Sequence, residues 1–511
     1  MSVRQRSLVI LLAIIRTLTG IWILSELLLT RSLAGLLLLC AAGLLLVGSS
    51  VRWIFLLLIP KADKVECVPA FRVAVVTTFV PGFESLTMLE RTLRAMSRIS
   101  YPHETWVLDE GNEEAVLRLS ERLGVRHFSR RNRPEYQAQD GVYQRGTKHG
   151  NYNSWLAETG FASYDVLAAI DPDQVPRMPF LTETLGHFRD PGIAYVQCPQ
   201  HYYNQSASII ARGSDEEGRD FYWLPQRVYH RFGSPSVIGA HGVHRIEALK
   251  TVGGFAPHVA DDLLLTLLYQ RAGWRGAYVP YVLAAGLAPV DWGTYLKQQR
   301  RWARSLLDVK LRVFPQLLEN LPIHSRIAGL MQGLSYFQDS AVGLCLLIAA
   351  CVQLAFGFPQ PVLLLLTDAV VLTAVGFMII TGLYPHICHG TEKNLSIYWR
   401  AGLLRCIKWP YTLLGLVDVI QRRDRGYDLT SKVSRPTSVQ WMMFWPHLLI
   451  CAAVATCWIA GTVSGNARGL VPNVVATVAL IPSLTLIGSI LVNPPPPYDP
   501  SLADAEQPTA Q

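Results

Sequence analysis

The chain has 511 residues, of which half are hydrophobic and 16% are charged, and its mean hydropathy is positive. A soluble enzyme of this length rarely has so apolar a composition, so membrane-spanning segments are expected. The formal net charge of +8 is modest, and arginine and lysine gather beside apolar runs. This pattern argues against nucleic acid as a partner and favours membrane lipids or an anionic substrate.

Two apolar runs follow one another at the start of the chain, from Leu8 to Leu29 and from Leu33 to Leu58. Each is long enough to span a bilayer. A signal peptide is the alternative for the first run, but no small-residue cleavage site is evident and a second run follows closely. We therefore expect two anchors within residues 1–59, with Arg4 and Arg6 holding the N-terminus on the cytoplasmic side.

Residues 60–324 have the composition of a cytoplasmic α/β domain. Three buried-strand patterns occur, at Phe71–Phe79, Thr105–Asp109 and Tyr164–Asp171, with helical patterns between them as in βαβ units. In an open α/β sheet the ligand binds beyond the carboxyl ends of the strands. The polar residues at these strand ends should therefore line one cleft: Thr77, Thr78, Asp109, Asp171 and Asp173.

Apolar runs return after the α/β domain. We predict transmembrane helices 3–4 within residues 325–383 and helices 5–6 within residues 441–492, at Ser335–Phe356, Val362–Leu383, Trp441–Val463 and Leu470–Val492. Six spans place both termini and the α/β domain on the cytoplasmic side.

The segment between the two pairs, residues 384–440, is basic and rich in tryptophan and tyrosine. Charges interrupt its apolar stretch at Ile397–Ile420, which favours an interfacial amphipathic helix over a seventh span. Residues 493–511 begin with NPPPPYDP, and a Pro-rich tail of this kind is expected to be disordered.

Two acidic motifs follow predicted strands. In Asp171-Pro172-Asp173, two carboxylates one residue apart can hold a divalent cation and the diphosphate that it bridges, although a solvated turn has the same pattern. In Asp109-Glu110-Gly111, a carboxylate could accept a hydrogen bond from a nucleobase or a ribose, and an ordinary loop acid is the alternative.

Two further motifs lie at the starts of helical patterns or within them. Asp261-Asp262 begin an apolar run, where acids can complement the helix dipole or act as a general base that deprotonates a sugar hydroxyl. The stretch Gln298–Trp302 (QQRRW) offers guanidinium groups for a leaving diphosphate and an indole face for a sugar ring. A basic interfacial helix with a tryptophan anchor is the alternative for this stretch.

In this order the motifs resemble the DDG, DxD, TED and QxxRW signature of processive family-2 glycosyltransferases, among them the bacterial cellulose synthase catalytic subunit. Three further stretches carry the resemblance. Lys148 in KHGN resembles the lysine of KAGN, residues 196–199 (VQCP) resemble VQTP, and residues 427–432 (YDLTSK) resemble the FxVTxK gating loop.

The resemblance implies a GT-A-like glycosyltransferase domain inserted into an α-helical transmembrane domain. It also implies that Asp262 is the catalytic base and that Mg²⁺ or Mn²⁺ binds at Asp171 and Asp173. The nucleotide-sugar is expected at Thr78, Asp109, Lys148, Asp171, Asp173 and Arg301. The acceptor is expected at Asp261, Gln298, Trp302 and Cys198, and the gating loop at Tyr427, Thr430 and Lys432.

The activity implied is that of a processive, inverting hexosyltransferase of the plasma (inner) membrane, which polymerises a UDP-sugar and passes the β-linked polysaccharide through its own membrane helices. UDP-glucose is the first choice of donor, because VQCP and YDLTSK resemble β-glucan synthases. The Asp-Asp pair and RWARS (Arg301–Ser305) resemble hyaluronan and chitin-oligomer synthases, so UDP-GlcNAc is the alternative. A non-processive lipid-linked sugar transferase and a transporter or scaffold without catalysis are the other readings.

Two expectations concern partners. The growing polysaccharide and membrane lipids are implied as partners, and the role allows for accessory export subunits. Only about 20 residues follow the last predicted span, so we expect no C-terminal PilZ domain that binds cyclic di-GMP.

Overall fold

The computed structural model of the chain describes residues 3–60, 70–357, 398–423 and 441–492. These residues divide into two compact units by their contacts. One is an α/β unit built on Ile59–Gln332, and the other consists of long helices that precede and follow it in the sequence. The α/β prediction for a domain between membrane helices is thereby confirmed.

The helical unit contains five helices that are long and apolar enough to cross a membrane, counted over the described residues. The helices of this unit are α1 (Val3–Leu29), α2 (Leu33–Leu58), α15 (Leu334–Phe356), α18 (Trp399–Ile420), η7 (Trp441–Phe444), α19 (Trp445–Ser464) and α20 (Leu470–Val492). The end of α18, from Asp418 on, belongs to the α/β unit. Five of the six predicted spans thus coincide with such a helix. The remaining one, Val362–Leu383, lies outside the described residues. Helix α18 covers the predicted interfacial segment, and its position at the interface stays a prediction.

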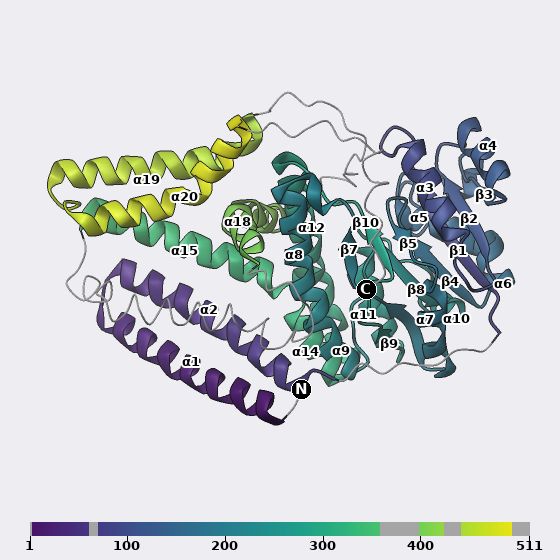
Figure 1. Cartoon of the computed structure of the whole chain (residues 1–511), viewed down its shortest axis with the longest axis horizontal. Helices are drawn as coiled ribbons and strands as arrows, with labels where there is room; N and C mark the ends of the chain where they lie inside the picture. Colours follow the sequence, from purple (N-terminus) through teal and green to yellow (C-terminus); the bar gives the residue numbers. More distant parts are fainter. Residues whose placement is uncertain (1–2, 61–69, 358–397, 424–440, 493–511) are drawn as a thin grey trace. The chain divides into compact units, whose positions relative to one another are not determined.

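Neighbouring helices of this unit pack along their lengths: α2 lies against both α1 and α15, and α19 lies against α15 and α20 (Figure 1). Arg16, in the middle of α1, is 1% exposed and donates hydrogen bonds to Leu46 O (2.9 Å) and to Ser50 Oγ (3.2 Å) of α2. A charged side chain within an apolar helix is costly unless it has partners. These bonds therefore favour close pairing of the first two helices.

The α/β unit is built on a seven-stranded mixed sheet of order β3-β2-β1-β4-β8-β6-β9. Its four strands from β3 to β4 run parallel, and β8 runs antiparallel to both β4 and β6. The strands are β1 (Val73–Phe79), β2 (Glu104–Asp109), β3 (Arg126–Phe128), β4 (Val166–Ile170), β6 (Ile193–Gln197), β8 (His241–Arg245) and β9 (Arg275–Tyr278). A second sheet contains β5 (Val175–Pro176), β10 (Ala284–Gly286) and β7 (Gln200–Tyr202).

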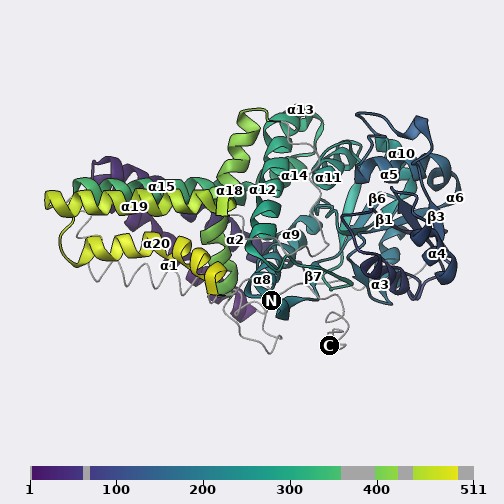
Figure 2. The same ribbon diagram turned by 90° about the horizontal axis from the view of Figure 1, so that it is seen from above.

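Helices cover both faces of the large sheet. Figure 2 shows α3 and α4 on one side of it and α5 and α10 on the other. Side chains alternate along β1: Val73 and Val75 join the core on the side of α3 and α4, whereas Ala74 and Val76 join the core on the side of α5. This alternation puts Thr78 on the face covered by α5.

The helices of the α/β unit mostly follow strands. They are α3 (Leu86–Met96), α4 (Glu114–Leu123), η1 (Pro134–Tyr136), α5 (Lys148–Trp155), η2 (Leu156–Gly160), α6 (Phe161–Ser163), α7 (Phe180–Thr184), η3 (Leu185–Arg189), η4 (Gln205–Ala207), α8 (Ile209–Trp223), α9 (Pro225–Arg231), α10 (Ile246–Val252), α11 (Asp261–Arg271), α12 (Trp292–Asp308), η5 (Val309–Val313), α13 (Phe314–Leu317), η6 (Leu318–Asn320) and α14 (Ile323–Met331). The acidic motifs of the sequence lie where β2 and β4 end and where α11 begins.

Candidate active site

A lysine and three carboxylates come together near the end of β4. Lys148 is the first residue of α5, whose N-cap Thr147 accepts a hydrogen bond from Gly150 N at 3.2 Å. Its ammonium lies 2.5 Å from Asp171 Oδ1 and also donates to Gly239 O. Burial alone would lower the pKa of Lys148, but the attractions of Asp171, Tyr152 and Asp261 together outweigh it and raise the pKa. Lys148 is therefore a fixed positive charge beside the first carboxylate of the DxD motif.

The acid pair Asp261-Asp262 occupies the first turn of α11 and lines a small pocket together with Lys148, Gly239 and His244. Asp262 Oδ1 accepts from Leu263 N at 2.7 Å, and its Oδ2 accepts from Gly239 N at 3.2 Å. The backbone of Gly239 thus contacts both the lysine and the acid. The structure brings Lys148, Asp171 and the acid pair into one site.

Burial raises the pKa of both acids of this pair. For Asp261 the pKa reaches about 7, because the charges of Asp262 and Asp171 raise it further while Lys148 lowers it. For Asp262, hydrogen bonds from the backbone N–H groups of Leu263 and Gly239 oppose the effect of burial. A carboxyl group whose pKa lies near neutrality can exchange a proton with a hydroxyl group under physiological conditions.

The other two acids expected at the nucleotide make backbone contacts. Asp109, at the end of β2, is fully buried; its Oδ1 accepts from Gly111 N at 2.9 Å and its Oδ2 from Glu113 N at 2.6 Å. Asp173 is 5% exposed, and its Oδ2 accepts from Leu287 N at 3.2 Å. In this conformation both carboxylates stabilise loops.

The donor set at Asp171 and Asp173 suits a hard divalent cation, because Mg²⁺ commonly takes one or two protein carboxylates and completes its shell with phosphate oxygens and water. Among the described residues no group of three or more His, Cys, Asp or Glu side chains is placed so that it could hold a metal ion.

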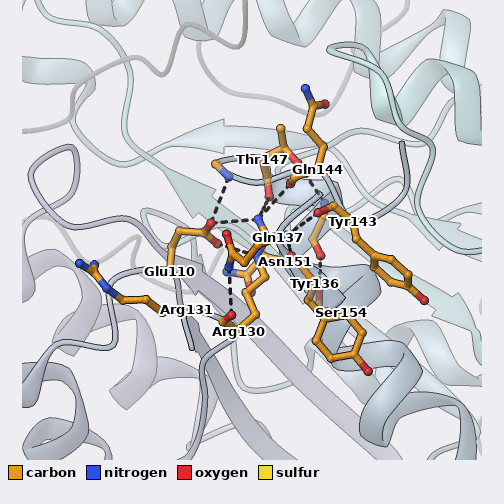
Figure 3. Close-up of polar contacts among 12 residues, drawn as sticks. Glu110, Arg130, Arg131, Tyr136, Gln137, Tyr143, Gln144, Thr147, Asn151 and Ser154 are labelled. Atoms are coloured by element: carbon orange, nitrogen blue, oxygen red, sulfur yellow. Dashed lines mark hydrogen bonds and ion pairs between the residues drawn. The ribbon is translucent and has the colours of Figure 1, made fainter. Parts of the chain in front are cut away.

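Sequence reasoning missed a buried arginine that organises the loop before Lys148 (Figure 3). Arg130 has no exposed surface and makes a bidentate ion pair with Glu110 at 3.0 and 2.9 Å. The same guanidinium donates to the carbonyl oxygens of Tyr136, Tyr143, Gln144 and Thr147. Glu110, the residue that departs from the DDG motif, also accepts from Gly146 N at 3.1 Å. We call Arg130, Glu110 and the loop 136–147 the arginine hub.

The QQRRW stretch lies on α12, which begins after Asp291, whose side chain accepts from Thr294 N at 2.9 Å. Gln298, Arg301 and Trp302 are three and four residues apart, so they share one face of the helix, and all three are partly exposed. Arg300 points elsewhere and pairs with Asp418 at 2.7 Å. The face that could meet a substrate therefore carries Arg301 rather than Arg300.

The remaining site predictions differ in their surroundings. Thr78 is buried at the end of β1. Cys198 is 1% exposed within a hydrophobic cluster, and burial raises the pKa of its thiol to about 12. Tyr427, Thr430 and Lys432, the predicted gating loop, lie outside the described residues. The roles of all the predicted site residues stay predictions.

Comparison with known proteins identifies relatives. The chain is 26% identical over 396 residues to the cellulose synthase catalytic subunit [UDP-forming] of Pseudomonas fluorescens, which covers 74% of this chain and 50% of that protein. It is 28% identical over 337 residues to the cellulose synthase 1 catalytic subunit [UDP-forming] of Komagataeibacter xylinus, covering 64% and 42%. The chain thus spans half or less of the length of these two relatives.

A solved structure supports the fold. The mannosyltransferase from Pyrobaculum calidifontis, solved in complex with GDP-Man and Mn²⁺, aligns with 77% of this chain and all of that chain, with 18% identity and a TM-score of 0.52. This likeness confirms the predicted GT-A-like fold. Residues 166–488, well over half of the chain, match the family described as Glycosyl transferase family group 2. The chain belongs to glycosyl transferase family group 2, and the predicted resemblance to cellulose synthase catalytic subunits is confirmed.

Proposed function

We propose that this chain is a processive, inverting glycosyltransferase that polymerises a UDP-sugar, with UDP-glucose as the first choice, into a β-linked polysaccharide and moves the polymer across the membrane. The observation that carries the proposal is the meeting of Lys148, Asp171 and the pair Asp261-Asp262 in one partly buried site of a family group 2 chain. The relatives that are named UDP-forming cellulose synthases support UDP as the leaving group.

Each residue has a distinct role in the proposed reaction. The acceptor hydroxyl gives its proton to Asp262 while its oxygen bonds to C1 of the sugar, and the bond from C1 to the UDP oxygen breaks on the opposite side. This single displacement converts an α-linked donor into a β-linked product. Lys148 and Arg301 neutralise the departing diphosphate. Asp171 and Asp173 would hold Mg²⁺ or Mn²⁺, which would neutralise further negative charge on the diphosphate; the solved mannosyltransferase contains Mn²⁺.

The acceptor is assigned to the α12 face. Trp302 offers a flat apolar surface on which a sugar ring can lie, and Gln298 can hydrogen-bond its hydroxyl groups. Asp261 would hold the terminal sugar beside Asp262. Cys198 would act through the shape of the pocket wall, because its side chain is buried.

The membrane location and the route of the polymer complete the proposal. Five long apolar helices within the described part of the chain support an integral membrane protein. We place it in the plasma (inner) membrane with the α/β unit in the cytoplasm, where UDP-sugars are made, and assign Tyr427, Thr430 and Lys432 to a loop that closes over the nucleotide. Accessory export subunits would take up the polymer on the far side.

The test is synthesis by the purified full chain in lipid vesicles, supplied with Mg²⁺ and radiolabelled UDP-glucose or UDP-GlcNAc in separate reactions. We expect release of UDP and a long β-glucan from UDP-glucose. Polymer from UDP-GlcNAc alone would support the processive mechanism but would show that UDP-glucose is not the donor. UDP-GlcNAc is the second candidate, which the RWARS stretch favours. A single sugar added to lipid, or no product from either donor, would contradict the proposal.

A further inference from the structure

A single imidazole bridges the start of α11 to the end of α12. His258 Nδ1 lies 2.9 Å from Ala260 N, and its Nε2 lies 3.0 Å from Asp308 Oδ2. A ring nitrogen that accepts from a backbone N–H carries no proton of its own, so the ring proton is on Nε2, from which it is donated to Asp308. The ring is thus used at both ends, once as an acceptor and once as a donor.

The carboxylate at the other end of this bridge is held in its charged form. Asp308 is the last residue of α12, and its second oxygen pairs with Arg312 Nη1 at 3.0 Å. The hydrogen bond from His258 and the charges of Arg312 and Arg304 lower the pKa of Asp308, against the opposing effect of burial. Hydrogen bonds to a charged acceptor are roughly twice as strong as neutral ones. The bridge is therefore anchored firmly on the α12 side.

The two elements that the bridge joins both carry proposed site residues. Ala260, whose N–H donates to the imidazole, is the N-cap of α11 and directly precedes Asp261-Asp262. Asp308 is seven residues, or about two helical turns, beyond Arg301 and lies on the same side of α12. The contacts of His258 thus link the acid pair to the α12 face, beside the apolar cluster that Ala260 and Leu263 share with Val309 and Phe314.

We propose that His258 is a positioning residue that, through Asp308, fixes the acid pair of α11 at the distance from α12 which sugar transfer requires. This inference rests on the proposed function. His258 itself touches neither donor nor acceptor, so its loss lowers the turnover of bound substrates and leaves the affinity for UDP unchanged. A misplacement of about 1 Å at a reacting group can cost about 100-fold in rate, so we expect a loss of about 10- to 100-fold in kcat.

The test is a double-mutant cycle on the full chain in lipid vesicles, with UDP release as the rate measurement. His258→Ala and Asp308→Ala should each lower kcat, and the double variant should fall no further than the slower single variant, because both remove the same bridge. The KM for the UDP-sugar and the Kd for UDP·Mg²⁺ should stay as in the unmodified protein. Losses of kcat that multiply in the double variant would overturn the proposal.

Two conservative variants separate positioning from folding. In His258→Asn the side-chain carbonyl can still accept from Ala260 N, and in His258→Gln the longer amide can still donate to Asp308. Both variants should have a higher kcat than His258→Ala, while the unfolding midpoints of the three variants match. Equal rates in all three variants, or rates that simply follow their unfolding midpoints, would show that His258 has no positioning role. If His258→Ala does not fold, the Asn and Gln variants are compared with the unmodified protein, and unchanged kcat in both overturns the proposal.

The matched control is the exposed ion pair of Arg72 and Asp165, 3.0 Å apart at the amino ends of β1 and β4. The same cycle on this pair should leave kcat unchanged, because it lies at the opposite ends of strands from the site. Absence of sugar transfer in the unmodified protein would contradict the proposed function, whereas normal transfer with no coupling between His258 and Asp308 would contradict this inference alone.

Discussion

Two of the pairs of consecutive acids in the α/β unit have surroundings that make them chemically different. In Asp109-Glu110, which we call the β2 pair, both acids have structural donors: backbone N–H groups donate to Asp109, and the guanidinium of Arg130 donates to Glu110. Asp261-Asp262, the α11 pair, lies beside Lys148, which is already paired with Asp171. Burial raises the pKa of both acids of the α11 pair.

This difference shows that two consecutive acids take different roles according to their surroundings in the fold. The hydrogen bonds to the β2 pair hold the ends of loops in place, whereas at Asp262 burial outweighs two backbone hydrogen bonds and raises the pKa. Carboxylates that share one cation in a partly buried pocket hold a proton more readily and can act as bases. The β2 pair thus contacts the framework of the loop before Lys148, and in the proposed reaction the α11 pair supplies the base.

The largest expected effect concerns a third pair, Asp171 and Asp173, which would hold the cation in the proposed reaction. Removal of divalent metal with excess EDTA should abolish polymer synthesis, and Mg²⁺ or Mn²⁺ should restore it. Asp173→Ala should weaken UDP binding in the presence of Mg²⁺ but not in its absence, as measured by calorimetry. Full activity in excess EDTA would refute the metal assignment.

Neutralising the base should give the next largest effect. Asp262→Asn removes the proton acceptor and keeps the shape of the side chain, so polymer synthesis should fall by about 10²- to 10⁴-fold. UDP binding should stay nearly intact, because Asp262 is assigned no contact with the nucleotide. Turnover equal to that of the unmodified protein would rule out Asp262 as the base. Glu110→Gln, which removes one negative charge from the β2 pair, is the control for the change of charge.

Breaking the arginine hub should affect stability more than chemistry. Arg130→Met leaves Glu110 partly buried without its partner, and loss of one member of a buried pair costs about 3–5 kcal/mol. The unfolding midpoint should fall clearly, and UDP binding should weaken because the loop before Lys148 loses its anchor. Arg118→Met, in an exposed pair with Glu114 at 2.8 Å, is the control and should change the midpoint little. An unchanged midpoint in Arg130→Met would contradict the framework role.

Much of the fold could be predicted from the sequence, because apolar runs mark it directly. The strands β1, β2 and β4 and five of the predicted spans are continuous apolar stretches whose length and flanks identify them. The acids of the site were found for the same reason, since each follows or precedes such a run.

The contacts between distant residues could not be predicted in this way. Arg130 stands in the run RRNR and is typical of a solvated basic loop, yet it is fully buried among four carbonyl oxygens. The pairing of Lys148 with Asp171 joins residues 23 positions apart, and that of His258 with Asp308 joins residues 50 positions apart. Such partners are set by how the strands and helices pack, which the pattern of one sequence does not encode locally.

The smallest expected effect is a shift in the pH dependence of polymer synthesis, and it distinguishes the α11 pair from the β2 pair most clearly. The pKa of Asp261 is about 7, because burial and the neighbouring charges of Asp262 and Asp171 outweigh the attraction of Lys148. The pair therefore takes up a proton as the pH falls below about 7 and loses it as the pH rises.

Since a base must be unprotonated, polymer synthesis at saturating UDP-sugar should rise from pH 6 to pH 8. Asp261→Asn removes the acid of the pair that titrates near pH 7, so the rise should then follow Asp262 alone and move down by about one pH unit. Glu110→Gln should leave the midpoint of the rise unchanged, because the β2 pair takes no part in the proton transfer. A midpoint that is the same in Asp261→Asn as in the unmodified protein would show that Asp261 does not set the ionisation of the α11 pair.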